Sequence, residues 1–486
     1  MSVKRSIYNT IELVTKEGKT IDIKNVVASI DIYEDLLCPC LSAKIVIVSA
    51  GGSIEDESGE LTTLYEGAKI RGGELVRIAI DPNSGRNLPI DLTLYVRSVS
   101  EVTRDDEKEF FTIDLVSREA IINEGSFVQK IYGKDIPLST HVQDIIGQYF
   151  PEVQSTVDET ANNFGFSGNQ MKAFEALVML ASKAVPKNGG GESSSGLDAT
   201  AGYFFYQTRD GFQFRSIDAL ISQDVKGKFF KTDQVISSYT EGEIADCKIE
   251  FFDVKKNQDL VDMLKKGAYS TDRRYFDPNT FTVDSPKLGS IYSGKDYVTQ
   301  GATNLGVPFD PSELNLSESN FSFTDDFPTL IETATYDLGT FTGKEVKTER
   351  NFDISQVSSQ KKMRYNTLFT QIIKVQLPLN SYLFAGDLIE ITVPKITSGD
   401  SKDIDTEQVS GVYMIEQVCH HYDPVGSFTS LAGLRDTYGL YGRNKGTTSS
   451  PITKAASSFA NAVSAGSGLN VGTAVRSAVD LTRSFF

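Results

Sequence analysis

The sequence predicts a mainly β protein with two similar, tandem-duplicated antiparallel β-barrel domains and an α/β region inserted between them. Three observations lead to this prediction. Apolar residues alternate with other residues towards both ends of the chain, they recur at helical spacing in its middle, and one series of strand patterns occurs twice. At 486 residues the chain is longer than a single hydrophobic core usually serves, so several domains are expected.

Residues 1–125 are predicted to form the first barrel. Short runs rich in β-branched residues are separated by clusters of Gly, Pro, Asn and Asp, such as DPNSGRN at 81–87. The predicted strands span 19–32, 43–49, 74–80, 90–102 and 109–116.

Residues 126–240 are predicted to form the α/β insert. Apolar residues share one helical face in 139–150 and in 170–185, and Ser139 or Thr140 is a suitable N-cap for the first of these helices.

A β-hairpin is predicted within the insert, at 202–218, with Asp210-Gly211 as its turn. The Gly- and Ser-rich stretch before it, at 188–202, predicts a flexible loop.

The rest of the chain divides into three regions. Residues 241–365 are predicted to be a mixed α/β region that partly pairs with the second barrel, with one short helix at 257–269. Residues 366–440 are predicted to form the second barrel. Residues 441–486 are rich in Ser, Ala and Gly and are predicted to be a basic tail that is loosely ordered without a partner.

The formal net charge of −17 is unevenly distributed. From Gly442 onward there are five basic residues and one acidic residue, which leaves +4 on the tail and −21 on the remainder. An acidic body repels nucleic-acid phosphates, so specific nucleic-acid binding is disfavoured.

No apolar run approaches the ~20 residues that a membrane helix needs. The N-terminal residues lack the apolar segment of a secretory signal, and four cysteines in this length do not suggest a disulfide framework. Synthesis in a reducing cytoplasm is expected.

An internal repeat supports the duplicated barrel. Three segments recur in the same order: GGELVRIAI (72–80) resembles AGDLIEITV (385–393), LYVRSVS (94–100) resembles YMIEQVC (413–419), and FTIDLVSRE (111–119) resembles FTSLAGLRD (428–436). Each match alone is weak, but the shared order indicates two copies of one unit. The repeat aligns Cys419 with Ser100, at the expected end of a strand that enters a hairpin turn.

No catalytic constellation is present, and no catalytic or cofactor-binding residue is predicted. The chain has three histidines, His141, His420 and His421, and no GxSxG or HExxH context. The Gly-rich stretch at 188–191 is not followed by Gly-Lys-Ser/Thr, so it is not a phosphate loop. No spacing singles out a pair of acids, which leaves a glycosidase unsupported but open. The protein is predicted not to be an enzyme.

Metal binding is also disfavoured. Cys38 and Cys40 together with Cys419-His420-His421 could supply zinc ligands, but their wide separation matches no recognised metal spacing. The acids of DRRYFDPN (272–279) lack the alternation and Gly of a calcium loop, so a solvated loop is predicted there. No metal is expected.

The Cys38-Pro39-Cys40 stretch is predicted to be a corner between two strands. It lacks the two-residue spacing of a thioredoxin-type motif and no helix follows it, so nothing is expected to lower the pKa of either thiol. Pro39 would fix the bend, and the thiols would pack as small residues.

Several stretches, taken in order, resemble the central baseplate hub of contractile-tailed bacteriophages, a family related to the spike hubs of secretion systems. They are IYEDLLCPCLSAKIVIVSAGG (32–52), GGELVRIAI (72–80), FFYQTRDGFQFRSIDAL (204–220), LKKGAYSTDRRYFD (264–277), LFAGDLIEITVP (383–394), SGVYMIEQVCHHY (410–422) and LRDTYG (434–439). The resemblance covers roughly residues 20–440. The chain departs from the family at its cysteine-containing turn, at the long charged loop 394–408 and in its extended tail.

The resemblance implies a structural role in the virion, at the baseplate of the viral tail. Such hubs are homotrimers whose duplicated barrels form a pseudo-six-fold ring, which joins a hexameric tail tube to a trimeric central spike. The ring leaves a channel for DNA ejection, through which DNA passes without specific binding. The implied partners are the chain itself, the tail tube protein, the central spike protein and, for the insert, the baseplate wedge proteins. The tail would fold onto the spike or a neighbouring acidic subunit, or stay disordered.

Two alternatives remain. The spike hub of a contractile secretion system usually continues into a β-helical needle, and the repetitive composition of such a needle is absent here. A tail-associated polysaccharide depolymerase or adhesin would need an aromatic, acidic cleft, and the lack of Trp disfavours sugar stacking.

Overall fold

The computed structural model describes residues 6–50, 52, 54–55, 60–82, 87–105, 108–187, 202–231, 246–268, 270–278, 280–284, 291–293, 305, 329–335, 355–394 and 408–436. The predicted tail 441–486, most of the loop 394–408 and the Gly-rich stretch 188–191 lie outside these residues. Most of the described elements are strands, as the sequence predicts. None of the described helices is long and apolar enough to span a membrane.

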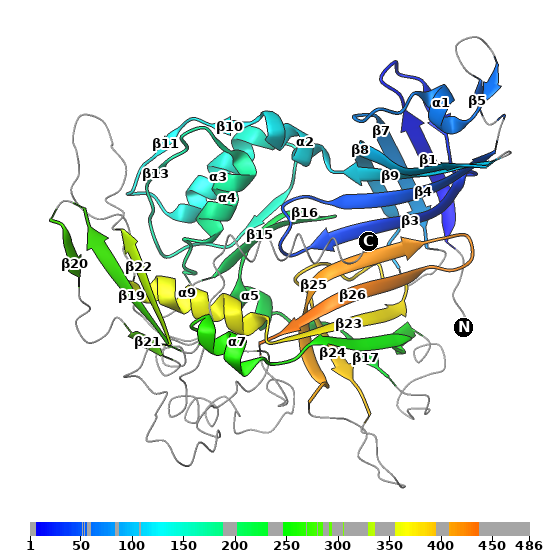
Figure 1. The fold of residues 1–486 in the computed structure, drawn as a ribbon. Helices are drawn as coiled ribbons and strands as arrows, with labels where there is room; N and C mark the ends of the chain where they lie inside the picture. The colour runs from blue at the N-terminus through cyan, green and yellow to red at the C-terminus, as the bar shows by residue number, and fades with distance from the viewer. Residues whose placement is uncertain are drawn as a thin grey trace, which may run out of the picture.

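A 13-stranded sheet dominates the molecule (Figure 1). Its N-terminal half contains β1 (Ile7–Val14), β2 (Thr20–Asp22), β3 (Val27–Asp35), β4 (Ser42–Ala50), β7 (Leu75–Asp81), β8 (Ile90–Arg104) and β9 (Lys108–Val116). Its C-terminal half contains β17 (Val225–Phe230), β18 (Phe251–Lys256), β23 (Gln371–Pro378), β24 (Leu388–Thr392), β25 (Gly411–Tyr422) and β26 (Phe428–Arg435). The strand order is β18-β23-β26-β25-β3-β4-β9-β8-β7-β1-β2, with β24 beside β25 and β17 beside β24.

Alternation places the core on one face of these strands. In β4 the residues Ala43, Ile45 and Ile47 are buried and their neighbours are half-buried, and the same period of two buries Ile373 and Val375 in β23. Each half of the sheet has its own apolar cluster. The predicted strand 19–32 is interrupted, because a turn at Lys24 separates β2 from β3.

The described residues contain no closed barrel. The N-terminal half of the sheet ends openly at β2, and its other side continues into β25 of the C-terminal half. The strand β25 pairs with β24 up to Met414 and with β3 from Gln417 onward, so its second half extends the sheet.

The insert forms a separate layer, with its own aromatic core, on the left of Figure 1. Its elements are α2 (Arg118–Gly125), β10 (Phe127–Val128), β11 (Ile131–Tyr132), α3 (Leu138–Tyr149), β12 (Ser155–Val157), β13 (Phe166–Ser167), β14 (Met171–Lys172), α4 (Ala173–Ala181), β15 (Tyr203–Thr208), β16 (Gly211–Ser216) and α5 (Ile217–Ser222). The predicted helices correspond to α3 and to the shorter α4. At the start of α3 it is Pro137, and not Ser139 or Thr140, that occupies the N-cap.

The turn of the β15–β16 hairpin differs by one residue from the prediction. Thr208 pairs with Gly211, so Arg209 and Asp210 form the turn. Gly211 has a φ of +114°, and a Cβ there would lie 2.2 Å from the carbonyl oxygen of Gln154. The glycine is therefore required by the close approach of the segment that leads into β12, and it belongs to the strand.

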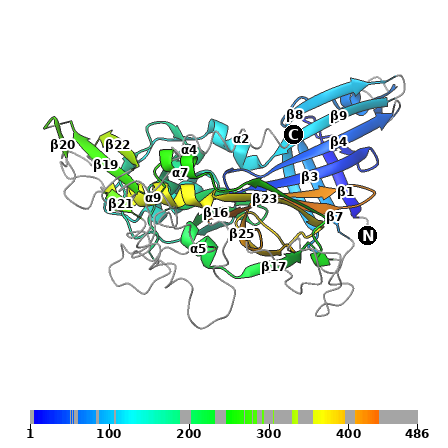
Figure 2. The same ribbon diagram turned by 60° about the horizontal axis from the view of Figure 1, so that its bottom comes forward.

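A small sheet lies at the far end of the molecule from β1 and β7 in both ribbon views (Figures 1 and 2). It consists of β19 (Ser270–Asp277), β20 (Thr282–Asp284), β21 (Ile291–Ser293) and β22 (Leu330–Thr335). The helices nearby in sequence are α7 (Leu260–Lys265) and α9 (Ser355–Leu368), while β5 (Ile54–Glu55), β6 (Leu61–Thr62) and α1 (Leu64–Ala68) lie beside the N-terminal half. The prediction of a solvated loop at 272–279 was wrong for 272–277, which form part of β19. Asp272 is buried there and pairs with Arg274.

Candidate functional site at the junction of two repeated sheet units

The structure contains the repeat as two five-stranded units. The first unit has the spatial order β3-β4-β9-β8-β7, and the second has the order β18-β23-β26-β25-β24. All neighbours within each unit are antiparallel, and the strands follow one another along the chain in the same sequence in both. The turn after β3 in the first unit is replaced in the second by the long segment between β18 and β23.

The register of the strands is also repeated. Leu75 lies opposite Tyr95 in the first unit, and Leu388 lies opposite Met414 in the second, as the aligned segments require. A β-bulge follows at the same place in each, at Arg97 in β8 and at Glu416 in β25. A shared register and a shared bulge indicate a duplicated structure beyond a similar composition.

The third aligned segment needs a correction of one residue. Val116 lies opposite Tyr95, whereas Leu434 lies opposite Met414, so Val116 corresponds to Leu434 and not to Gly433. The shared Phe-Thr letters suggested the wrong register, because strand pairing is fixed by cross-strand contacts. Cys419 and Ser100 do correspond, but both lie within strands and not at a turn.

The two units join where β25 pairs with β3. The antiparallel pairing runs from Gln417 opposite Asp35 to Tyr422 opposite Ile30, and it places Cys419 opposite Tyr33. The corresponding edges of the other two strands are open. Among the described residues, neither the edge of β8 from Ser98 onward that faces away from β9 nor the outer edge of β18 has a strand partner.

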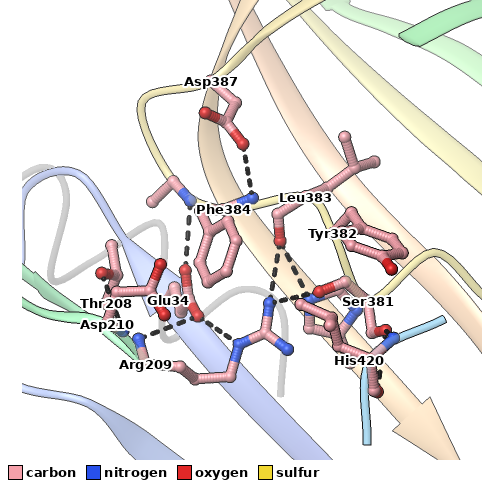
Figure 3. Close-up of polar contacts among 12 residues, drawn as sticks. Glu34, Thr208, Arg209, Asp210, Ser381, Tyr382, Leu383, Phe384, Asp387 and His420 are labelled. Atoms are coloured by element: carbon pink, nitrogen blue, oxygen red, sulfur yellow. Dashed lines mark hydrogen bonds and ion pairs between the residues drawn. The ribbon is translucent and has the colours of Figure 1, made fainter. Parts of the chain in front are cut away.

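A buried ion pair holds this junction to the insert (Figure 3). The guanidinium of Arg209, in the β15–β16 turn, donates through Nε to Oε1 of Glu34 in β3 at 2.6 Å, and both side chains are buried. The Nη2 atom of Arg209 donates to the carbonyls of Ser381 and Leu383, each at 3.0 Å. The other oxygen of Glu34 accepts from the backbone N–H of Ala385 at 3.2 Å. One charged pair therefore connects β3, the insert and the loop before β24.

His420 completes this cluster as a neutral residue. Its Nε2 lies 3.2 Å from the carbonyl oxygen of Leu383, and its Nδ1 lies 3.1 Å from the hydroxyl of Thr429 (Figure 3 shows His420 beside Leu383). Burial, assisted by the charge of Arg209, lowers the pKa of His420 well below its ordinary value. A neutral ring donates to the carbonyl and accepts from the hydroxyl, which is a structural arrangement.

His421, on the other face of β25, interacts with carboxylates. Its Nδ1 lies 2.6 Å from Oδ1 of Asp31, which is its cross-strand partner in β3, and its Nε2 lies 3.5 Å from Asp423. Burial disfavours the charged ring, but Asp31 and Asp423 together raise the pKa of His421. Cys419 donates to the same Asp31 oxygen at 3.7 Å, and burial raises the pKa of this thiol.

Two acids are buried where β25 changes partner. Glu416 is the bulged residue, and its Oε1 has no hydrogen-bond partner among the described residues. Burial, together with the nearby charge of Asp35, raises the pKa of Glu416 to about 8. Burial also raises the pKa of Asp35 to about 6. No sequence motif indicated either residue.

Cys38 and Cys40 lie in the turn between β3 and β4, as predicted, with their Sγ atoms 3.5 Å apart. The prediction that nothing lowers a thiol pKa was wrong. The hydrogen bond with Cys38 lowers the pKa of Cys40 against the opposing effect of burial, and the charge of Arg97 acts in the same direction as this hydrogen bond.

The remaining candidates are not brought together. His141 lies in the core of the insert, with Nε2 3.0 Å from the carbonyl oxygen of Gly133 and its ring edge-on to Tyr132. In the part of the chain that the structure describes, no three His, Cys, Asp or Glu side chains gather so that they could hold a metal ion.

The chain resembles solved structures of tail and secretion proteins, at low sequence identity. No protein-family model matches the chain, and no curated protein matches its sequence. The tail protein from Neisseria meningitidis aligns with 90% of this chain and 100% of its own, at 10% identity and a TM-score of 0.48. The 43 kDa tail protein of prophage MuSo2 from Shewanella oneidensis aligns with 88% and 98%, also at 10% and 0.48.

A third solved structure is an E. coli component of the type VI secretion system, which exhibits structural similarity to the T4 bacteriophage tail proteins gp27 and gp5. It aligns with 85% of this chain and 76% of its own, at 8% identity and a TM-score of 0.37.

Proposed function

We propose that this protein is a structural hub of a phage tail baseplate, a homotrimer whose duplicated units form a pseudo-six-fold ring. The observation that carries the proposal is the junction between the two units within one chain. At this junction, β25 of the second unit pairs with β3 of the first unit. The corresponding edges, that of β8 in the first unit and that of β18 in the second, are open among the described residues.

The open edges of β8 and β18 correspond to the two strand edges that pair at the internal junction. The strand β8 corresponds to β25, and β18 corresponds to β3, so β8 of one copy can pair with β18 of the next as β25 pairs with β3. Such a contact is head-to-tail, and head-to-tail contacts close into rings when the rotation allows it. Three chains with two units each give six similar positions, which would match a hexameric tube to a trimeric spike.

The side chains at these edges favour this pairing. Val102 in β8 is 41% exposed and Phe251 in β18 is 53% exposed. The edge of β8 also carries Glu101, and that of β18 carries Lys255 and Lys256. Pairing would cover apolar side chains, bring opposite charges together, and remove two strand edges that invite aggregation.

The other parts of the chain fit the same arrangement. The insert is a layer with its own core, so its outer surface would remain available to wedge proteins around the ring. The acidic body would line a channel that lets DNA pass without binding it, since phosphate-binding walls would slow transit. The spike protein and the tail tube protein would bind opposite ends of the ring.

A disulfide cross-link tests the register of the proposed contact. Cys419 lies opposite Tyr33 at the internal junction, and the corresponding positions are Ser100 and Lys256. The double variant Ser100→Cys/Lys256→Cys is expected to give covalent trimers under mild oxidation. Each single variant should give none. Tyr33→Cys, which can pair with the native Cys419 inside one chain, is the positive control for the geometry.

The mass in solution is the complementary measurement. Three copies of the 53.3 kDa chain, about 160 kDa, are expected by light scattering. A protein that stays monomeric at high concentration, with or without a spike protein, and gives no cross-link while the Tyr33→Cys control does, would contradict the proposal.

A further inference from the structure

The two thiols of the β3–β4 turn are held in a defined geometry by the insert. The backbone N–H of Gln207 donates to the carbonyl of Cys38 at 3.4 Å, and the N–H of Leu41 donates to Oε1 of the same glutamine at 2.9 Å. Gln207 is buried and is itself fixed by Ser117 and Glu119. Both ends of the dithiol turn are therefore tied to one buried residue, Gln207, at one end through its backbone and at the other through its side chain.

This anchoring keeps the sulfur atoms close. The Sγ–Sγ separation is 3.5 Å, so closing to the disulfide length of about 2.05 Å needs a movement of only about 1.5 Å. Neither thiol is fully buried by accessible surface, which lets a small reagent reach the turn. Nothing in the proposed ring uses these residues.

We propose that Cys38 and Cys40 form a reversible dithiol–disulfide site that is oxidised by exchange with a small-molecule disulfide such as glutathione disulfide. The two cysteines have different roles. The hydrogen bond with Cys38 and the cation of Arg97 both lower the pKa of Cys40, so Cys40 is the attacking thiolate and Cys38 is the resolving thiol.

The exchange is balanced in two steps. The Cys40 thiolate attacks one sulfur of glutathione disulfide, forming a mixed disulfide and releasing one glutathione thiolate, which takes up a proton. The Cys38 sulfur then loses its proton and attacks Cys40 Sγ, which forms the Cys38–Cys40 bond and releases the second glutathione. The protein loses two electrons and two protons, and the external disulfide is reduced to two thiols.

The experiment uses the full-length protein in buffers with graded ratios of reduced to oxidised glutathione. Remaining thiols are alkylated after denaturation, and the peptides are weighed by mass spectrometry. The peptide with Cys38 and Cys40 is expected to lose two hydrogen atoms and to retain neither alkyl group nor glutathione. Cys247 and Cys419 are expected to remain alkylated at ratios where this has occurred.

Two single variants distinguish the roles. Cys38→Ser should accumulate a glutathione adduct on Cys40, because the resolving thiol is absent. Cys40→Ser should react at least tenfold more slowly, and Cys247→Ser, the matched control, should behave as wild type. The proposal is overturned if the 38–40 peptide keeps two alkylated thiols at ratios where Cys247 already carries glutathione. Equal adduct rates in the Cys38 and Cys40 variants would overturn the assignment of the attacking thiol.

Discussion

At the residue scale, the junction is a set of buried charges with specific partners. Arg209 and Glu34 are far apart in the sequence, and each satisfies backbone groups as well as the other's charge. A buried pair of this kind adds little net stability compared with apolar packing, but the loss of one partner leaves an uncompensated charge. We interpret the pair as fixing the position of the insert relative to both units, because its contacts lie on β3, the β15–β16 turn and the loop before β24.

Glu416 makes stability depend on pH. Burial raises its pKa in the folded state to about 8, above the ordinary value of 4.5. Between about pH 4.5 and 8, Glu416 is protonated in the folded protein but ionised in the unfolded chain. The stabilising contribution of this proton to the free energy of unfolding is therefore complete below about pH 4.5 and is lost as the pH rises through 8. Glu416→Gln cannot ionise and should be more stable than wild type at pH 9, by at least about 1 kcal/mol.

The measurement is the free energy of unfolding from urea titrations between pH 5 and 9. The free energy of unfolding should decline less steeply over this range in Glu416→Gln than in wild type. Part of the decline should remain in the variant, because Asp35 and other buried acids also have raised pKa values. The exposed Glu152→Gln serves as control, with an unchanged slope. A slope identical to wild type in Glu416→Gln would contradict the prediction.

At the element scale, the two units share a local device before their aligned strands β7 and β24. Gly73 and Gly386 have φ values of +89° and +88°, and each donates its N–H to the matching residue of the next strand, Val96 or Ile415. The acid that follows each glycine accepts hydrogen bonds from backbone N–H groups of the preceding loop. Repeated glycine and acid letters in the sequence thus correspond to repeated turn geometry.

The pair of glycines offers a matched test of packing against backbone strain. In Gly73→Ala the new Cβ would meet only the end of Lys16, at 3.7 Å, so the cost is the left-handed backbone alone, about 1 kcal/mol. In Gly386→Ala the Cβ would lie 2.4 Å from the hydroxyl of buried Tyr206. The second variant should lose at least about 1 kcal/mol more, since overpacking typically costs 1–3 kcal/mol.

Chemical denaturation of both variants gives the comparison. Gly386→Ala/Tyr206→Phe is the control, because removing the hydroxyl should recover part of the additional loss. Equal destabilisation by the two single alanine variants would show that the turn, and not the contact with Tyr206, determines the cost.

At the scale of the whole molecule, assembly is expected to depend on exposed residues of the open edges. Val102→Glu and Phe251→Lys each place a charge where the proposed pairing would cover an apolar side chain. Both positions are exposed in the single chain, so each change should alter the free energy of unfolding by no more than about 0.5 kcal/mol, as is typical of surface substitutions. The Tm should therefore fall by no more than a few degrees. Each should shift the mass from trimer to monomer.

Light scattering and thermal melts on the same samples separate the two effects. Val425→Glu, at an 80% exposed position in the loop between β25 and β26, is the control and should remain trimeric. Trimers in both edge variants at wild-type strength would contradict the pairing of β8 with β18.

Much of the fold was predictable because it depends on local pattern. Alternation located β4, β7, β8 and β9, helical spacing located α3 and the centre of α4, and Pro39 marked the corner between β3 and β4. The repeat was visible from letters alone. These features follow from the period of each element, which any stretch of sequence carries within itself.

The candidate site was less predictable, for a physical reason. Alternation specifies which face of a strand is buried but not which strand lies against its edge, so the pairing of β25 with β3 left no local signal. The turn at Asp210-Gly211 and the register of the last repeat segment were mispredicted at this level, and the closure of each unit into a barrel is not confirmed by the described residues. Each depends on contacts between segments that are distant in the chain.

The sequence by itself determined the strands of the repeated segments, the helices α3 and α4 of the insert, the duplication and the corner at Cys38-Pro39-Cys40, since these rest on residue periodicity and backbone preference. Only the tertiary structure decided that the two units share one continuous sheet, that Arg209 meets Glu34, and that the two thiols lie 3.5 Å apart beside Gln207. These contacts join residues from different units and the insert, and their free energies depend on burial and pairing that arise only after the chain has folded.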